Sequence, residues 1–179
     1  MQKNNMPDEL TAALKPADVA AFAATIITHR GQPAGICIKF RRFNGANALV
    51  HLTPQENGRL LVALKEYMET GRHKGLMLQF YDNPTLAEDL ADTHPYNTLL
   101  SMAPPLTPEE AGEARKATTV VKSTFAEHGS YFIYRVGLAD GSAAEFALHE
   151  CVAFNVWGFI TKMEQDSQLL FGHGSIGLA

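Results

Sequence analysis

The chain is poor in the features that define several common classes of protein. It holds only two cysteines, Cys37 and Cys151, without a CxxC spacing, which predicts two buried thiols rather than a disulfide framework or a metal site. No run of eighteen apolar residues occurs, and the first ten residues lack the basic and apolar regions of a signal peptide. We therefore expect a cytoplasmic protein with no membrane partner.

Motifs for catalysis and metal binding are also missing. The seven histidines show none of the HxH, HxxxH or HExxH spacings that zinc sites use. The glycine-rich segment at 172–175 lacks the lysine and the helix that a phosphate-binding loop requires. The sequence thus predicts no catalytic residue, no metal ligand and no cofactor, and it favours a non-enzymatic binding or regulatory protein.

A weak internal repeat is the main positive signal. Asn44-Gly45 and Asp140-Gly141 are hairpin dipeptides that lie 96 residues apart. The same offset pairs the alternating apolar residues of two strands and the apolar residues of two helices, namely Ile36, Ile38, Phe40, Leu52, Leu60 and Leu64 with Phe132, Tyr134, Val136, Leu148, Val156 and Ile160. The pattern indicates a duplicated module, and chance recurrence of a common meander is the alternative.

The length of 179 residues and the 46% hydrophobic content suit one domain or two small fused modules. We predict an α+β fold of two fused repeats, each an antiparallel β-meander followed by an α-helix, with the helices packed on one sheet face. The predicted strands are 24–29, 35–43, 46–52, 75–81, 117–126, 130–138 and 142–148. The predicted organisation is an N-terminal helical extension (1–23), a first module (24–81), an acidic and proline-rich connection (82–116), a second module (117–171) and a flexible tail (172–179).

The two predicted helices differ in what they signal. The first has a complete start signal, with Thr53 as N-cap, Pro54 at the first helical position and Glu56 in a capping box. The second, at 150–164, carries more apolar residues than one face needs. We expect it to lie between two surfaces, supplied by the other module or by a second copy, so a homo-oligomer is expected. The connection contains a further helix-start signal at 107–110.

Charge is distributed unevenly along the chain. Residues 20–75 hold eight Lys and Arg against three acids, giving +5, whereas residues 76–179 hold five against thirteen, giving −8. Such asymmetry is typical of a basic face for an anionic partner, or of basic and acidic faces that attract each other in an assembly.

A basic surface follows from strand alternation in the first module. Because the apolar residues of 36–40 point toward the helix, Lys39 and Arg41 point to the opposite face. Arg42 and Phe43 flank the hairpin turn, and Arg135 is the repeat equivalent of Lys39. A basic track with an aromatic platform is the pattern of single-stranded nucleic-acid binding, in which Phe43 would stack on a base.

The helix start and the strand before it suggest a family. A meander strand ending in Leu52-Thr53-Pro54, followed by a helix that opens with Gln55-Glu56, resembles the positive cofactor four group of single-stranded-DNA-binding transcriptional coactivators, and more distantly the Whirly proteins. The resemblance covers about 35–68 and, less well, 131–164. It implies paired sheets and helices and single-stranded-DNA binding. The acidic second module departs from a symmetric DNA-binding surface.

Two other interpretations of the basic residues compete with nucleic-acid binding. The basic residues can simply keep an exposed sheet face in water. Alternatively, the chain is a protein-interaction or assembly module whose basic face meets an acidic protein surface, on its own second half in a neighbouring copy or on another protein.

Overall fold

The computed structural model describes residues 18–70, 106–129 and 131–166. They form two three-stranded antiparallel sheets and three helices, an α+β arrangement. In chain order the elements are β1 (Val19–His29), β2 (Gln32–Arg42), β3 (Asn47–Leu52), α2 (Pro54–Glu69), α5 (Pro108–Ala117), β4 (Val120–His128), β5 (Tyr131–Leu138), β6 (Ala143–His149) and α6 (Glu150–Asp166).

Each sheet is a meander joined by tight turns. The first sheet has the order β1-β2-β3 and the second sheet the order β4-β5-β6. Gly45 and Gly141 adopt φ values of 84° and 86°, a region that favours glycine. This conformation explains why each of the two predicted hairpin turns contains a glycine. The side chains of Asn44 and Asp140 accept hydrogen bonds from backbone N–H groups two residues later.

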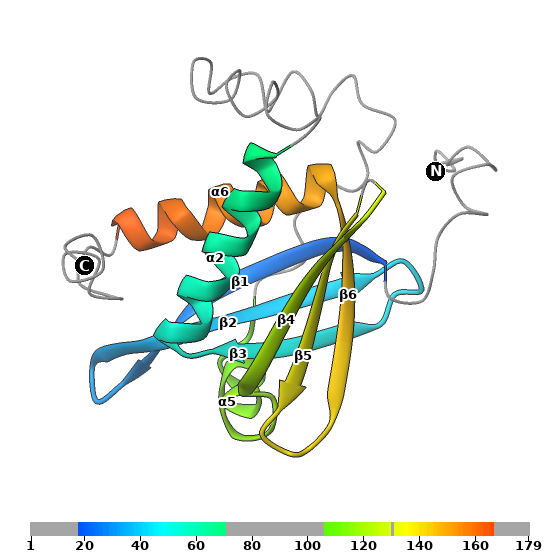
Figure 1. Cartoon of the computed structure of the whole chain (residues 1–179). Helices are drawn as coiled ribbons and strands as arrows, with labels where there is room; N and C mark the ends of the chain where they lie inside the picture. The colour runs from blue at the N-terminus through cyan, green and yellow to red at the C-terminus, as the bar shows by residue number, and fades with distance from the viewer. Residues whose placement is uncertain (1–17, 71–105, 130, 167–179) are drawn as a thin grey trace, which may run out of the picture.

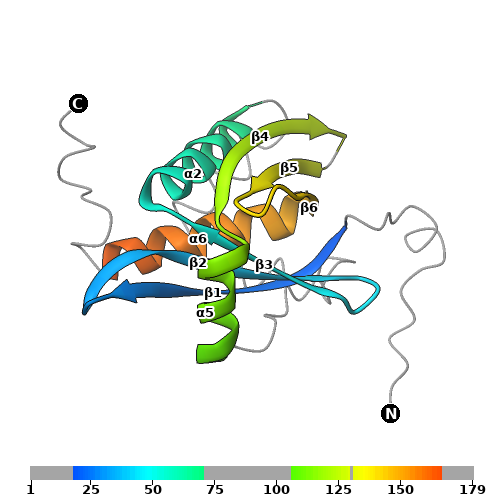
Figure 2. The same cartoon turned by 90° about the horizontal axis from the view of Figure 1, so that it is seen from below.

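The two sheets cross, with α2 and α6 together on one side (Figure 1). Helix α5 lies against the opposite face of the first sheet (Figure 2). The core lies between the inner faces of the sheets and the two long helices. Phe40 of the first sheet and Phe146 of the second meet there with ring centroids 4.5 Å apart. Helix α6 contacts β1 as well as β5 and β6, so it packs against both sheets.

Short bridges link the sheets at two corners. His51 at the end of β3 forms a parallel bridge with Thr119 just before β4, and Asp18 just before β1 forms one with Ala147 of β6. The backbone N–H of His51 donates to the carbonyl of Thr118 at 3.0 Å. These bridges connect the six strands into one body, although each sheet keeps its own register.

Gly35 permits a close approach between β2 and the end of β3. A Cβ atom at Gly35 would lie 2.4 Å from the carbonyl oxygen of Leu52 and 2.8 Å from Nε2 of His51. No side chain fits at this position while β2 and β3 keep their spacing.

The predicted N-cap and start of α2 are confirmed, whereas the Glu56 carboxylate, predicted to close a capping box on Thr53, accepts from Ser123 and Arg59 instead. Thr53 is the N-cap and its hydroxyl accepts from the backbone N–H of Glu56 at 3.3 Å, with Pro54 at the first helical position. Helix α5 begins at the predicted signal and extends beyond it to Ala117.

Several predicted boundaries were wrong. The strand predicted from 117 begins at Val120, because Ala117 ends α5, and the strand predicted from 35 begins at Gln32. The largest error lies at β1. Residues 19–23 were expected in an N-terminal helical extension, and they form the first half of β1. Their alanine content favours a helix in isolation, but they pair with β2, where Phe22 lies opposite Phe40. Residues 1–17 of that extension, the predicted strand at 75–81 and the predicted tail lie outside the described residues.

Candidate interaction surfaces

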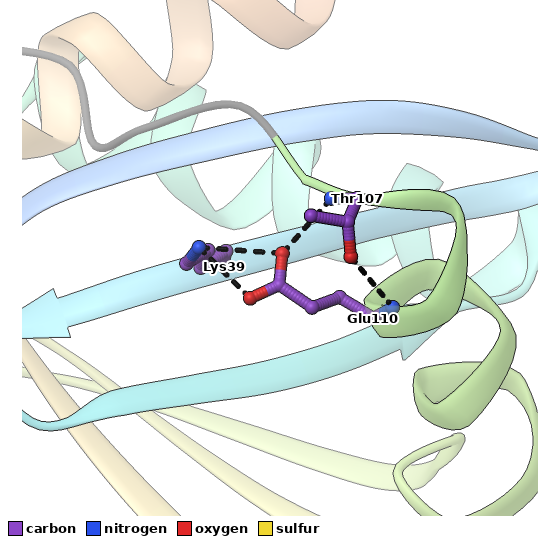
Figure 3. Close-up of polar contacts among 3 residues, drawn as sticks. All are labelled: Lys39, Thr107 and Glu110. Atoms are coloured by element: carbon purple, nitrogen blue, oxygen red, sulfur yellow. Dashed lines mark hydrogen bonds and ion pairs between the residues drawn. The ribbon is translucent and has the colours of Figure 1, made fainter.

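Lys39 is not on an open face. It points away from the core as expected, but α5 covers it and leaves the residue 6% exposed. Its ammonium donates to both carboxylate oxygens of Glu110, at 2.9 and 3.3 Å (Figure 3). The expectation of an exposed basic track is therefore corrected at this position, because a helix from a distant part of the chain supplies the counter-charge.

The start of α5 holds Glu110 in place for this contact. Thr107 and Glu110 form a reciprocal capping box, in which the N–H of Thr107 donates to Glu110 at 2.9 Å and the N–H of Glu110 donates to the Thr107 hydroxyl at 3.2 Å. The hydrogen bond from the backbone N–H of Thr107 is the main cause that holds the pKa of Glu110 below its usual range, and the hydrogen bond from the Lys39 side chain is the next. The carboxylate is thus charged wherever the protein is near neutral pH.

Cys37 lies under the same helix. It is fully buried, and burial, assisted by the charge of Glu110, raises the pKa of its thiol to about 12. The thiol therefore stays protonated at neutral pH and packs with Ile27, Leu49 and Ala111 as a small apolar side chain.

Arg42 and Arg135 come together at one acidic residue. Arg42 Nη1 donates to the backbone carbonyl of Glu145 at 3.0 Å, and its guanidinium lies 4.9 Å from the ring centroid of Phe146. Arg135 Nε donates to the carboxylate of the same Glu145. Two predicted basic residues from different halves of the chain thus contact Glu145, whose carboxylate pairs with Arg135 and whose backbone carbonyl accepts from Arg42.

A shallow hollow of about 500 Å³ lies beside this cluster on the outer face of the second sheet. Its lining includes Lys122, Thr124, Arg135, Gly137, Ala143 and Glu145. The side chains of Arg135 and Glu145 are about half exposed, at 54% and 44%. The hollow is therefore open to solvent, in contrast to the face of the first sheet that α5 covers.

The other two predicted site residues are partly buried. Arg41 lies on the outer face of the first sheet, between Ala21 and Asn47 in the strand register. Phe43 packs against the core, and its backbone N–H donates to the carbonyl of Asp18 at 3.3 Å. The structure therefore places the five residues in three groups. Lys39 lies under α5, Arg42 and Arg135 contact Glu145, and Arg41 and Phe43 lie near the turn between β2 and β3.

Sequence reasoning missed a buried polar cluster between α2, β4 and α6. Glu56 accepts from the hydroxyl of Ser123 at 2.6 Å and from Arg59 at 3.2 Å. Asn57 donates to the carboxylate of Glu164 at 2.7 Å, and both residues are buried. Asn57 and Glu164 are polar residues on the apolar sides of their helices, which is the only signal in the sequence.

An apolar groove runs along α2 beside the edge strand β4. The groove, called the α2 groove below, has a volume of about 450 Å³ and a mostly apolar lining. Val62 projects from α2 with 58% of its surface exposed. The lining includes Pro54, Gly58, Val62, Ala63, Glu66 and Phe125.

Two classes of site find no support in the described part of the chain. Over residues 18–70, 106–129 and 131–166, no three His, Cys, Asp or Glu side chains gather as metal ligands would. Among those residues, no helix has the length and apolar character to cross a membrane. Comparisons with family models, with curated proteins and with solved structures find no match for this chain.

Proposed function

We propose that this protein is a non-enzymatic protein-interaction or assembly module that docks a partner in the α2 groove. The observation that carries the proposal is the groove itself, a shallow and mostly apolar hollow between α2 and Phe125 of the edge strand β4. Val62, exposed in its lining, leaves apolar surface in water that a partner would cover.

The charge pattern supports a protein partner over an anionic polymer. The basic first half and the acidic second half meet inside the chain, where Lys39 pairs with Glu110 and Arg42 reaches the backbone of Glu145. Arg135, the equivalent of Lys39, is paired with the Glu145 carboxylate. Lys39 and Arg135, whose charges are paired within the chain, attract phosphates less strongly than unpaired cations would.

We also infer that the two halves are copies of one module. Strands β3 and β6 begin 96 residues apart, at Asn47 and Ala143, and helices α2 and α6 also begin 96 residues apart, at Pro54 and Glu150. The agreement of two independent boundaries with the offset read from the hairpin dipeptides supports the duplication, which provides equivalent positions for comparison.

A photo-crosslinking amino acid at Val62 tests the proposed function. In cells that express the full chain, the Val62 position should form adducts with protein, while the same amino acid at the exposed turn residue Ala46 should not. Mass spectrometry identifies the adducts. Absence of any protein adduct specific to Val62 would overturn the proposal.

A second candidate is single-stranded nucleic-acid binding, and a specific observation favours its location. Arg135 and Lys122 line the same hollow on the second sheet, which brings two cations together there, whereas Lys39 of the first sheet is covered. Phosphates would contact this surface, with Glu145 displaced from Arg135.

Fluorescence anisotropy of a labelled mixed-sequence single-stranded oligonucleotide tests this candidate at several salt concentrations. Binding should fall with salt and should be lost in Lys122→Glu/Arg135→Glu. Lys65→Glu, on the exposed side of α2, is the matched control. No binding at low salt, or equal binding by the double variant and the control, would remove the candidate.

A further inference from the structure

The two long helices carry opposite features at equivalent positions. With the 96-residue offset, Ala63 of α2 corresponds to Phe159 of α6, and Glu66 corresponds to Lys162. One helix therefore has a small side chain and an acid where the other has a large ring and a base. Both pairs have the same spacing of three residues, which is one helical turn.

Helix α6 carries aromatic side chains at the positions where α2 has small residues. Phe159 packs edge-to-face on Phe22 of β1, with ring centroids 5.8 Å apart and an interplanar angle of 79°. Phe154 of α6 packs against the core, and its equivalent in α2 is Gly58. Gly58 and Ala63 thus leave α2 without the large rings that α6 carries at the same offsets, one of which, Phe159, packs against β1.

Among residues 18–70, 106–129 and 131–166, few large apolar side chains are exposed enough to enter the groove. Of the described residues, the exposed large apolar ones are Val62, Val121 and Phe159. Phe159 is 39% exposed, and Lys162 is exposed one turn further along α6. Glu66 is exposed in the lining of the α2 groove.

We propose that the occupant of the α2 groove is α6 of a second copy of this chain, with the exposed part of the Phe159 ring packing beside Ala63 and Lys162 pairing with Glu66. This inference rests on the proposed function and names its partner. Because the two pairs share one spacing, a neighbouring α6 that runs in the direction of α2 satisfies both contacts at once. The contact joins unlike surfaces, so it closes as a reciprocal dimer or continues from copy to copy.

Charge reversal tests the pairing in the full chain. Glu66→Lys and Lys162→Glu should each weaken self-association about three- to tenfold in sedimentation velocity over a concentration series, and the two substitutions together should restore it. Glu69→Lys makes the same charge change on α2 outside the groove and should leave self-association unchanged. A double variant that associates no better than the single variants would overturn the pairing.

Filling the groove from within tests its apolar part. Ala63→Phe places on α2 the ring that α6 carries at the equivalent position, so self-association should weaken about 100-fold. Unchanged circular dichroism and an unchanged unfolding midpoint would show that the fold is retained. Self-association of Ala63→Phe equal to that of the unsubstituted chain would overturn the proposal.

Failure of this inference is distinguishable from failure of the proposed function. A chain that stays monomeric up to high concentration, together with Val62 crosslinks to another protein, would overturn the second copy as occupant and leave the proposed function standing. A monomeric chain without protein crosslinks would overturn both. Crosslinks from Val62 to the α6 segment of the same chain sequence, in a species of twice the chain mass, would support both.

Discussion

Lys39 of β2 and Glu110 of α5 form an ion pair at 2.9 Å that ties a helix to the outer face of the first sheet. Arg135 of the second sheet, 96 residues after Lys39, pairs instead with Glu145 on the neighbouring strand. The position equivalent to Glu145 in the first sheet is Leu49, which packs under α5. The residue types at these positions thus separate a covered face from an open one.

The difference in burial predicts a difference in stability. Lys39→Met should lower the free energy of unfolding by about 1–3 kcal/mol, because it leaves Glu110 without its cation at a partly buried site. Arg135→Met, the same change at the exposed pair, should change it by less than about 0.5 kcal/mol. Urea denaturation measures both, and equal losses would contradict the assignment of the two environments.

The lowered pKa of Glu110 predicts a pH dependence of known sign. A carboxyl whose pKa is lower in the folded than in the unfolded chain stabilises the fold above the unfolded value, and this stabilisation is lost as pH falls through the folded value. The difference in unfolding free energy between the natural chain and Glu110→Gln should therefore be largest above about pH 4.5, the ordinary pKa of a glutamate carboxyl. It should shrink as the pH falls below that value. A constant difference from pH 6 to pH 3 would contradict the prediction. Asp140, whose pKa is also lowered, is present in both proteins and cancels.

The close approach at Gly35 predicts that a single methyl group is not tolerated. Gly35→Ala should destabilise the fold by about 2 kcal/mol or more, since the new Cβ atom meets backbone at Leu52. Gly112→Ala is the control, because this exposed helical glycine has no atom within 4 Å of its Cβ position. It should stabilise α5 by about 0.5–1 kcal/mol. Thermal unfolding of the two variants gives the comparison.

The buried pair of Asn57 and Glu164 predicts strong coupling. Asn57→Ala should cost about 2–4 kcal/mol, because it removes a buried donor to the Glu164 carboxylate. Asn57→Ala/Glu164→Met installs the residues found at the equivalent positions, Ala153 and Met68, both fully buried. The double variant should be more stable than Asn57→Ala, with a coupling of about 1 kcal/mol or more. Additive losses in a double-mutant cycle would contradict this.

The features that could be read from the sequence are those that depend on neighbouring residues. The turns at Gly45 and Gly141 follow from the backbone conformation that glycine permits, and the start of α2 follows from the hydrogen bond between Thr53 and Glu56. Alternation placed Lys39 on the correct face of β2, because side-chain direction in a strand is a local property.

Other features depend on contacts between distant segments, and no local pattern encodes them. Alanine-rich residues 19–23 form a strand because β2 offers them backbone partners and Phe40 a ring to pack on. The single-stranded-DNA-binding hypothesis assumed an open face at Lys39, which α5 covers. The role of that face in nucleic-acid binding stays a prediction.

By itself the sequence determined two meanders with a helix after each, the capped start of α2 and the faces of the strands, because hairpin dipeptides, capping boxes and alternation act within a few residues. Only the tertiary structure decided which charges stay free. Glu110 lies 71 residues from Lys39, and Glu145 lies 103 residues from Arg42. Such ion pairs and hydrogen bonds form only once packing of the two halves has brought these residues together, and the same packing leaves the α2 groove open.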